Sequence, residues 1–296
     1  MKTLRFGTRK STLALAQTRL IMDAVSAAYP EYKLELVPIV TTGDVNMKPF
    51  SEASDKFGIK GLFTQELEQA LRDGTIDAAV HSLKDVPAVQ DERLPLLAFY
   101  HRDDPRDVLV LREGVNENDQ RVVGCSSARR RIQIHDLFPN AHVEPVRGNV
   151  ETRLRKLDEG QFDALVLAAA GLKRLGLDRR ISRSCSVDEI VPAPGQGVLA
   201  VQGRAEDANS EWLDALLDPD TADCATAERA FSARLNGGCS APVGAYAKVA
   251  GSEIELIGFF ADEARGIKRR GSLTGPRKEA RALGEKLAER LLREAR

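Results

Sequence analysis

A lysine and an aspartate stand side by side in the segment H-S-L-K-D-V-P at residues 81–87, where they could bind a ligand and move protons. The segment follows residues 76–80, a short apolar run with the composition of a β-strand. Lys84 and Asp85 therefore lie at the carboxyl end of a predicted strand, which is where open α/β sheets bind ligands. In a turn both side chains could face a cleft, although such a pair, taken alone, is more often solvated.

Arginines gather where three further predicted strands run into helices, in the segments C-S-S-A-R-R-R (125–131), R-G-N-V-E-T-R (147–153) and G-L-K-R (171–174). Cations in the first turn of a helix oppose its dipole, so a bound carboxylate or phosphate would compensate Arg129 and Arg130. Solvated arginines explain any one junction equally well. Three junctions together are what a cleft for several carboxylates requires.

Cys239 directly follows two glycines that end a helix predicted over residues 221–235. The glycines clear space around a thiol on an exposed turn, which suits a covalent attachment point. A small buried side chain is nevertheless the more frequent role of a cysteine. Near the amino terminus, Ser11 is a suitable N-cap for the first helix. Together with Arg9 it could form an anion-binding site at a strand-to-helix turn.

Alternating strands and helices must position these residues. We expect strands around residues 4–6, 34–40, 76–80, 108–111, 122–124, 142–146, 163–170, 198–201, 243–249 and 254–260. The βαβα alternation predicts parallel sheets in two α/β units, followed by a small α+β unit that ends in a helix on Leu283, Leu287 and Leu291. The first helix is expected to bury Leu13, Ala16, Leu20, Ala24 and Ala28. Residues 45–61 show no period and carry Lys56 and Lys60, which is typical of a mobile lid or of disorder.

The composition excludes several classes of protein. With 296 residues, two or three domains are expected. A net charge of −1 provides no global field for nucleic acid. The start of the chain lacks the apolar core of a signal peptide, and no apolar run could cross a bilayer, so we expect a cytoplasmic protein without a membrane partner. The cysteines show no C-x-x-C spacing and the histidines no i, i+4 pair, so no metal site is expected.

Eight motifs in fixed order resemble the porphobilinogen deaminase (hydroxymethylbilane synthase) family of tetrapyrrole biosynthesis. They are T-R-K-S-T-L-A-L at 8–15, K-G-L-F at 60–63, H-S-L-K-D-V-P at 81–87, S-S-A-R-R at 126–130, R-G-N-V-x-T-R at 147–153, A-A-G-L-K-R-L-G at 169–176, P-G-Q-G at 194–197 and N-G-G-C at 236–239. They span nearly the whole chain, and the ordered set is specific where any single motif is not.

The resemblance implies an α/β fold with two periplasmic-binding-protein-like domains and a smaller C-terminal α+β domain. Residues 1–99 with 197–217 would form the first domain, 103–193 the second and 220–296 the third. It also implies a transferase that joins four porphobilinogen molecules head to tail with loss of ammonia, and then releases hydroxymethylbilane by hydrolysis. The reaction would start from a dipyrromethane cofactor bound through a thioether to Cys239. A monomer is expected.

The matched motifs imply the roles of individual site residues in this chain. Asp85 matches the catalytic carboxylate, while Lys56 and Lys60 lie on the lid loop. The expected cofactor- and substrate-binding residues are Arg9, Ser11, Lys84, Ser127, Arg129, Arg130, Arg147, Gly148, Arg153, Arg174 and Gln196. The chemistry suits these residue types, because each pyrrole carries two carboxylates and one ionised aspartate can stabilise a pyrrole cation.

Three positions depart from the usual pattern of the family. Cys125 stands where threonine is usual, Ala128 where leucine is, and Gln202 where glutamate is. Two alternatives to an enzymatic function are also compatible with the sequence. One is a two-lobed cytoplasmic anion-binding module without catalysis, and the other is nucleic-acid binding through residues 129–131, which the net charge disfavours.

Overall fold

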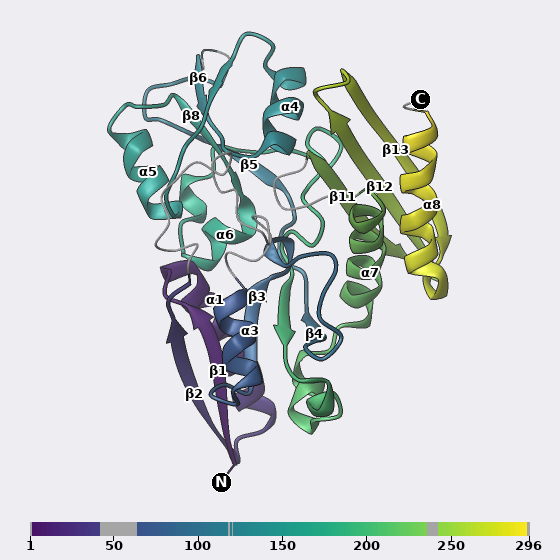
Figure 1. Cartoon of the computed structure of the whole chain (residues 1–296). Coiled ribbons are helices and arrows are strands. Elements are labelled where there is room, and N and C mark those ends of the chain that lie inside the picture. Colours follow the sequence, from purple (N-terminus) through teal and green to yellow (C-terminus); the bar gives the residue numbers. More distant parts are fainter. Residues whose placement is uncertain (1, 42–63, 118, 120, 236–241, 295–296) are drawn as a thin grey trace.

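The computed structural model describes residues 2–41, 64–117, 119, 121–235 and 242–294. They form three groups of elements, each built on its own sheet (Figure 1). The first group lies at the bottom of the view, the second at the upper left and the third at the right, next to the carboxyl terminus. In this part of the chain no helix is long and apolar enough to cross a membrane.

The first sheet has the order β2-β1-β3-β10-β4. Its strands are β1 (Lys2–Arg9), β2 (Tyr32–Ile39), β3 (Ala78–Ser82), β4 (Leu96–Tyr100) and β10 (Leu199–Gln202). Strand β1 runs parallel to β2 and β3, whereas β10 is antiparallel to both of its neighbours. The late strand β10 thus returns to the first sheet, as the resemblance implies.

Helices α1 (Thr12–Ala28) and α3 (Gln65–Arg72) belong to this first group. The buried residues of α1 are Gln17, Thr18, Ile21 and Val25, so the predicted apolar face was wrong. Leu20, which was expected inside, is 42% exposed. Apolar residues lie on nearly every side of this helix, and the spacing therefore does not decide which side packs on the sheet. The 3₁₀ turn η5 (Glu211–Leu216) adds Trp212, Leu213 and Leu216 to the same core.

The second sheet has the order β7-β6-β8-β5-β9. Its strands are β5 (Asp107–Leu111), β6 (Val122–Gly124), β7 (His142–Glu144), β8 (Ala164–Ala168) and β9 (Arg183–Ser184), accompanied by α4 (Ala128–Leu137), α5 (Val150–Asp158) and α6 (Ala169–Arg174). The prediction of purely parallel sheets was wrong, because β5 is antiparallel to β8 and β9. The chain reaches β5 directly from the first sheet and β10 directly from the second sheet. Neither strand is therefore joined to its neighbours in the sheet by the helical crossover that parallel strands need.

The third group packs α7 (Pro219–Arg234) and α8 (Ala280–Arg293) against the sheet β11-β12-β13. Strands β11 (Val243–Ala250) and β12 (Glu253–Asp262) were predicted, whereas β13 (Ile267–Pro276) was not. Strand β13 consists mostly of polar residues and glycines, so its sequence lacks the apolar pattern that predicts a strand. The remaining short turns are η2 (Leu83–Asp85), η3 (Asp178–Arg180), η4 (Ala205–Asp207) and η6 (Arg277–Glu279).

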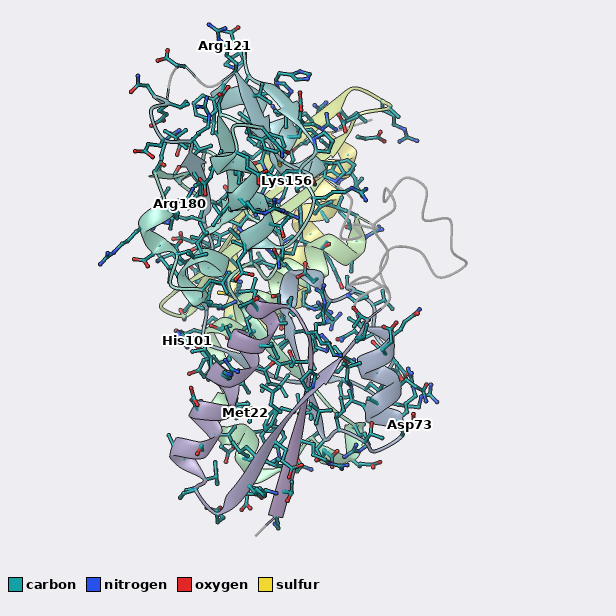
Figure 2. The ribbon with its side chains drawn as sticks, turned by 90° about the vertical axis from the view of Figure 1, so that its left-hand side faces the viewer. Met22, Asp73, His101, Arg121, Lys156 and Arg180 are labelled. Atoms are coloured by element: carbon teal, nitrogen blue, oxygen red, sulfur yellow. The ribbon has the colours of Figure 1, made fainter. Side chains whose placement is uncertain are left out.

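Two connections join the first two groups, through residues 101–106 and 185–198. Figure 2 places His101, at the start of the first connection, between the lower lobe that carries Met22 and the upper lobe that carries Lys156 and Arg180. The ends of β3, α4 and α5 that bear the predicted site residues all belong to the region where these two lobes approach each other.

Candidate active site

The Lys84–Asp85 pair lies on the single 3₁₀ turn η2 at the carboxyl end of β3. The turn is fixed at its start by the N–H of Leu83, which donates to the carbonyl of Val198 at 3.0 Å. It closes with a bond from the N–H of Val86 to the carbonyl of Leu83 at 3.1 Å. The predicted position of the pair at the carboxyl end of a strand is therefore confirmed, and the backbone there forms a turn.

Two glycines of the P-G-Q-G segment let the second connection pass close to this turn and to the first connection. Gly195 has a φ of +74°, and a Cβ there would lie 2.6 Å from Cγ of Leu83. Gly197 has a φ of +88°, and a Cβ there would lie 2.5 Å from the carbonyl oxygen of Asp103 in the first connection. Both positions require glycine, because the left-handed backbone and the close approach each disfavour a side chain.

Lys84 shares its surroundings with the arginine pair of α4. Burial lowers the pKa of Lys84 to about 8, with Asp85 acting in the opposite direction. Arg130 and Arg129 lower it further, and Asp107 raises it. The first lobe thus presents its Lys–Asp turn to the arginines of the second lobe, across the junction between the two sheets.

Arg129 and Arg130 occupy the first turn of α4, which Ser127 caps by accepting the N–H of Arg130 at 3.4 Å. Both arginines are nearly buried, with 3% and 8% exposure. Nη1 of Arg129 lies 2.7 Å from Oδ2 of Asp107, and Nη2 of Arg130 lies 2.7 Å from Oδ1 of the same carboxylate. The compensating anion that the sequence called for is therefore a residue of the chain itself.

Sequence reasoning missed Asp107. Its carboxylate is fully buried at the start of β5, directly before the apolar residues 108–110. A charged residue that opens a buried strand is unusual unless it is paired, and that pattern could have singled it out. The two arginines overcome the effect of burial and hold the pKa of Asp107 well below its usual range.

Arg153 belongs to the same neighbourhood. Its Nε donates to the carbonyl of Gly148 at 2.8 Å. Burial and the charge of Arg130 lower the pKa of Arg153, whereas Asp85 raises it. Asn149, which was not predicted, caps α5 by accepting the N–H of Thr152 at 2.8 Å. Arg147 is half-buried next to Gly148 in the same loop.

The anion-binding site predicted near the amino terminus has the expected strand-to-helix turn and N-cap. Arg9 ends β1, and Ser11 caps α1 by accepting the N–H of Ala14 at 3.3 Å. His81 lies on β3 close enough to Arg9 for that charge to act on its pKa. Burial is the larger effect and lowers the pKa of His81 to about 4. Nε2 of His81 lies 2.9 Å from Oε1 of Gln202.

Gln196 and Arg174 are positioned by the connections between the lobes. Gln196 is 2% exposed, and its Nε2 donates to the carbonyl of Pro105 at 2.7 Å and to Oδ1 of Asp107 at 2.9 Å. Arg174 donates from Nη2 to the carbonyl of Gly197 at 2.6 Å. Gln196 therefore joins the arginine pair, whereas Arg174 lies against the second connection.

Two family descriptions match the chain. Residues 4–211 match "Porphobilinogen deaminase, dipyromethane cofactor binding domain", and residues 222–293 match "Porphobilinogen deaminase, C-terminal domain". The chain belongs to the porphobilinogen deaminase family. This membership supports the enzyme over the non-catalytic binding module.

Relatives of the same name match along nearly the whole chain. The porphobilinogen deaminase of Acetivibrio thermocellus is 48% identical over 99% of this chain and 99% of its own. That of Alkaliphilus oremlandii is 46% identical over 96% of this chain and 95% of its own. Among solved structures, the periplasmic aliphatic sulphonate binding protein SsuA of Escherichia coli is 12% identical with a TM-score of 0.41, covering 80% of this chain and 71% of that one.

The described residues fit the cofactor of the porphobilinogen deaminase family. A dipyrromethane built from two porphobilinogen units carries several carboxylates, which guanidinium groups bind through paired N–H donors. Within the described part of the chain, Arg129 uses only Nη1 for its bonds to Asp107 and Val191, so its Nε and Nη2 remain for a ligand. The site therefore offers suitable donors beside Asp85, even though Asp107 already occupies part of the pair.

Three predicted residues lie outside the described residues, namely Cys239, Lys56 and Lys60. The second thiol near the site, Cys125, is described. It is 5% exposed, and its Sγ lies 3.6 Å from the carbonyl oxygen of Ser127. Burial raises the pKa of Cys125, which keeps it in the weakly nucleophilic thiol form.

Proposed function

We propose that this chain joins four porphobilinogen molecules head to tail, with loss of ammonia at each addition, and hydrolytically releases hydroxymethylbilane. The observation that carries the proposal is the position of Asp85, on a fixed turn among Lys84, Arg130 and Arg153. A carboxylate among these cations suits a substrate that is itself a dicarboxylate but becomes cationic at its reacting carbon.

Asp85 is proposed to stabilise that cation and to move protons. When porphobilinogen loses its amine as ammonia, positive charge develops on the pyrrole and its exocyclic carbon. A carboxylate next to the pyrrole N–H lowers the energy of this state. When the free α-carbon of the preceding pyrrole attacks the cationic exocyclic carbon, the new C–C bond leaves a proton on the attacking α-carbon, and Asp85 can accept that proton. The bound dipyrromethane would supply the free α-carbon at which synthesis begins.

The basic residues are proposed to hold the acetate and propionate groups. With them we propose the polar residues and the glycine of the same motifs, so that the full set is Arg9, Ser11, Lys84, Ser127, Arg129, Arg130, Arg147, Gly148, Arg153, Arg174 and Gln196. Arg174 has the weakest support, because its guanidinium donates to Gly197 and lies 3.6 Å from Asp103. We also propose that residues 45–61 form a lid loop on which Lys56 and Lys60 act.

Cys239 is proposed to attach the dipyrromethane through a thioether. The support is the N-G-G-C segment at residues 236–239, since the other cysteines, Cys125, Cys185 and Cys224, are all buried. Burial also raises the pKa of Cys185 and Cys224, each to about 12. A thiol that must act as a nucleophile needs access and a reachable thiolate form.

The proposal extends to the organisation of the protein. We assign residues 1–99 with 197–217, residues 103–193 and residues 220–296 to three domains, and expect a cytoplasmic monomer without nucleic-acid, membrane or metal partners. The sheet membership of β10 supports the first assignment. Size-exclusion chromatography with light scattering would test the monomer.

Intact-mass spectrometry of the purified protein tests the function. We expect the polypeptide mass plus two deaminated porphobilinogen units, localised by peptide mapping to the peptide that contains Cys239. Cys239→Ser should fold and lack the added mass, because an alcohol is a much poorer nucleophile than a thiolate. An unmodified parent protein that releases no product from porphobilinogen would refute the proposal.

A further inference from the structure

Asp107 is the common partner of three site residues. Its Oδ2 accepts Nη1 of Arg129 at 2.7 Å. Its Oδ1 accepts Nε and Nη2 of Arg130 at 2.9 and 2.7 Å, and Nε2 of Gln196 at 2.9 Å. Both carboxylate oxygens are thus occupied, and each donor comes from a residue expected to contact the ligand.

The backbone at Asp107 is fixed by the sheet. Asp107 is the first residue of β5 and pairs with Ala168 of β8. Its carbonyl accepts the N–H of Cys185 at 2.9 Å, and its side chain is fully buried. A buried carboxylate needs strong partners, and two guanidinium groups provide them. This anchoring makes Asp107 a rigid reference point on the second sheet.

The bonds to Asp107 determine which N–H groups of the two arginines are already used. Arg129 is held through Nη1 alone, which also donates to the carbonyl of Val191 at 2.6 Å. Arg130 is held through Nε and Nη2, while its Nη1 donates to the carbonyl of Val166 at 3.2 Å. The planar guanidinium groups cannot rotate without breaking these bonds. Their orientation is therefore set before any ligand arrives.

We propose that Asp107 is a positioning residue for the recognition of substrate carboxylates: it orients Arg129 and Arg130 so that their remaining N–H groups face the cleft next to Asp85. This inference rests on the proposed function. One carboxylate against two guanidinium groups also leaves the triad with a net positive charge, so orientation is obtained without cancelling the attraction for anions.

Asp107→Asn tests the proposal, because asparagine has nearly the same shape but no charge. Its amide would place a donor against one arginine, so at least one guanidinium group should turn. We expect KM for porphobilinogen to rise by about tenfold or more, with a smaller change in kcat, since losing an oriented charged hydrogen bond weakens ligand binding by about that factor. Incorporation of the dipyrromethane, measured by intact mass, should fall in parallel.

Asp163→Asn is the matched control. Asp163 lies at the opposite end of the β5–β8 strand pair, where its Oδ1 accepts Nη2 of Arg112 at 2.9 Å. Its Oδ2 accepts the N–H groups of Arg121 and Val122, each at 3.0 Å. This variant should lower the thermal midpoint as Asp107→Asn does, but retain the parental KM and the added mass.

The outcomes separate the possible roles of Asp107. Parental KM and full added mass in folded Asp107→Asn would overturn the proposal and leave Asp107 a structural residue. A lower KM would also overturn it, because it would show that Asp107 only offsets the charge of the arginines. If Asp107→Asn does not fold, Asp107→Glu keeps the charge but displaces it by one methylene group. A raised KM in that variant supports positioning, and an unchanged KM refutes it.

The parent protein distinguishes this failure from failure of the proposed function. If the parent carries two deaminated porphobilinogen units and the Asp107 variants behave like it, only the positioning role is lost. If the parent carries no added mass and forms no product, the proposed function itself is wrong.

Discussion

Arg102 and Glu228 form a buried, bidentate ion pair between the first connection and helix α7. Nη1 of Arg102 lies 2.7 Å from Oε1 of Glu228, and Nη2 lies 2.9 Å from Oε2. The same carboxylate accepts the N–H of Gly195 in the second connection and the N–H of Ala247 in β11, both at 2.7 Å. One side chain of the C-terminal unit thus holds both connections between the lobes.

Glu228→Gln should destabilise the protein strongly. Glutamine keeps the shape of the side chain but leaves the charge of Arg102 uncompensated, with Glu228 itself only 1% exposed in the parent. Removing one partner of a buried ion pair costs about 3–5 kcal/mol. The free energy of unfolding from urea titration, followed by circular dichroism, measures this loss.

The control for Glu228→Gln is Glu263→Gln. Glu263 also pairs with an arginine, Arg131, at 2.5 Å, but its side chain is half exposed. Exposed pairs contribute about 0–1 kcal/mol, so this variant should unfold nearly like the parent. Equal losses in the two variants would mean that burial of the Arg102 pair adds nothing.

Replacement of Asp85 should affect the maximal rate more than substrate affinity. Asp85→Asn has nearly the same shape but can neither stabilise a cation by charge nor take a proton, so kcat should fall by about 10²–10⁴. Asp85→Glu retains the charge on a longer arm and should keep some activity, reduced by misplacement. Steady-state rates at saturating porphobilinogen give the test. An asparagine variant as fast as the glutamate variant would remove Asp85 from the chemistry.

The sequence was sufficient for local features of the site. The position of Lys84 and Asp85 at the end of a strand and the cap at Ser11 depend on residues close together in the chain, and the structure contains both. Short-range geometry follows from residue type, so these features could be predicted. Roles carried over by resemblance, such as attachment at Cys239, stay predictions.

What the sequence did not provide depends on contacts between distant segments. Asp107 meets Gln196 across 89 positions of the chain, and no local pattern pairs them. The antiparallel direction of β5 and β10 depends on how the connections cross between the sheets. The buried face of α1 was missed for a related reason, because packing against the sheet, and not spacing alone, selects Ile21 over Leu20.

Loss of Arg129 should damage folding as well as ligand binding. If Arg129 only bound a ligand, Arg129→Leu would spare folding. In the structure it leaves Asp107 fully buried with one guanidinium partner fewer. We therefore expect a lower thermal midpoint together with reduced incorporation of the dipyrromethane, measured by differential scanning fluorimetry and intact mass. A parental thermal midpoint would show that Arg130 alone suffices for Asp107.

Arg131→Leu is the control for that prediction, since Arg131 follows on the same helix but its side chain is 38% exposed. It should change the thermal midpoint little and leave the added mass intact. Equal loss of added mass from Arg131→Leu would assign the effect to α4 as a whole and not to the pair at Asp107.

The pH dependence of substrate capture should report Lys84. Burial lowers the pKa of Lys84 from 10.5 to about 8, so its ammonium is lost in the native protein as the pH rises through about 8. Above that pH the side chain no longer attracts a carboxylate, and kcat/KM, which reflects the free enzyme, should fall. The sign for stability is opposite: the unfolded chain keeps the proton up to about 10.5, so burial of a charged Lys84 is a cost below pH 8 that disappears as the pH rises between these values.

Lys84→Arg isolates this effect, because arginine stays charged throughout the range. Ionisation of porphobilinogen itself contributes equally to both profiles, so only the parent should show the additional fall in kcat/KM near pH 8. The variant should also lack the rise in thermal midpoint that the parent shows between about pH 8 and pH 10.5. Parallel kcat/KM profiles for parent and variant would show that the charge of Lys84 does not contribute to substrate capture.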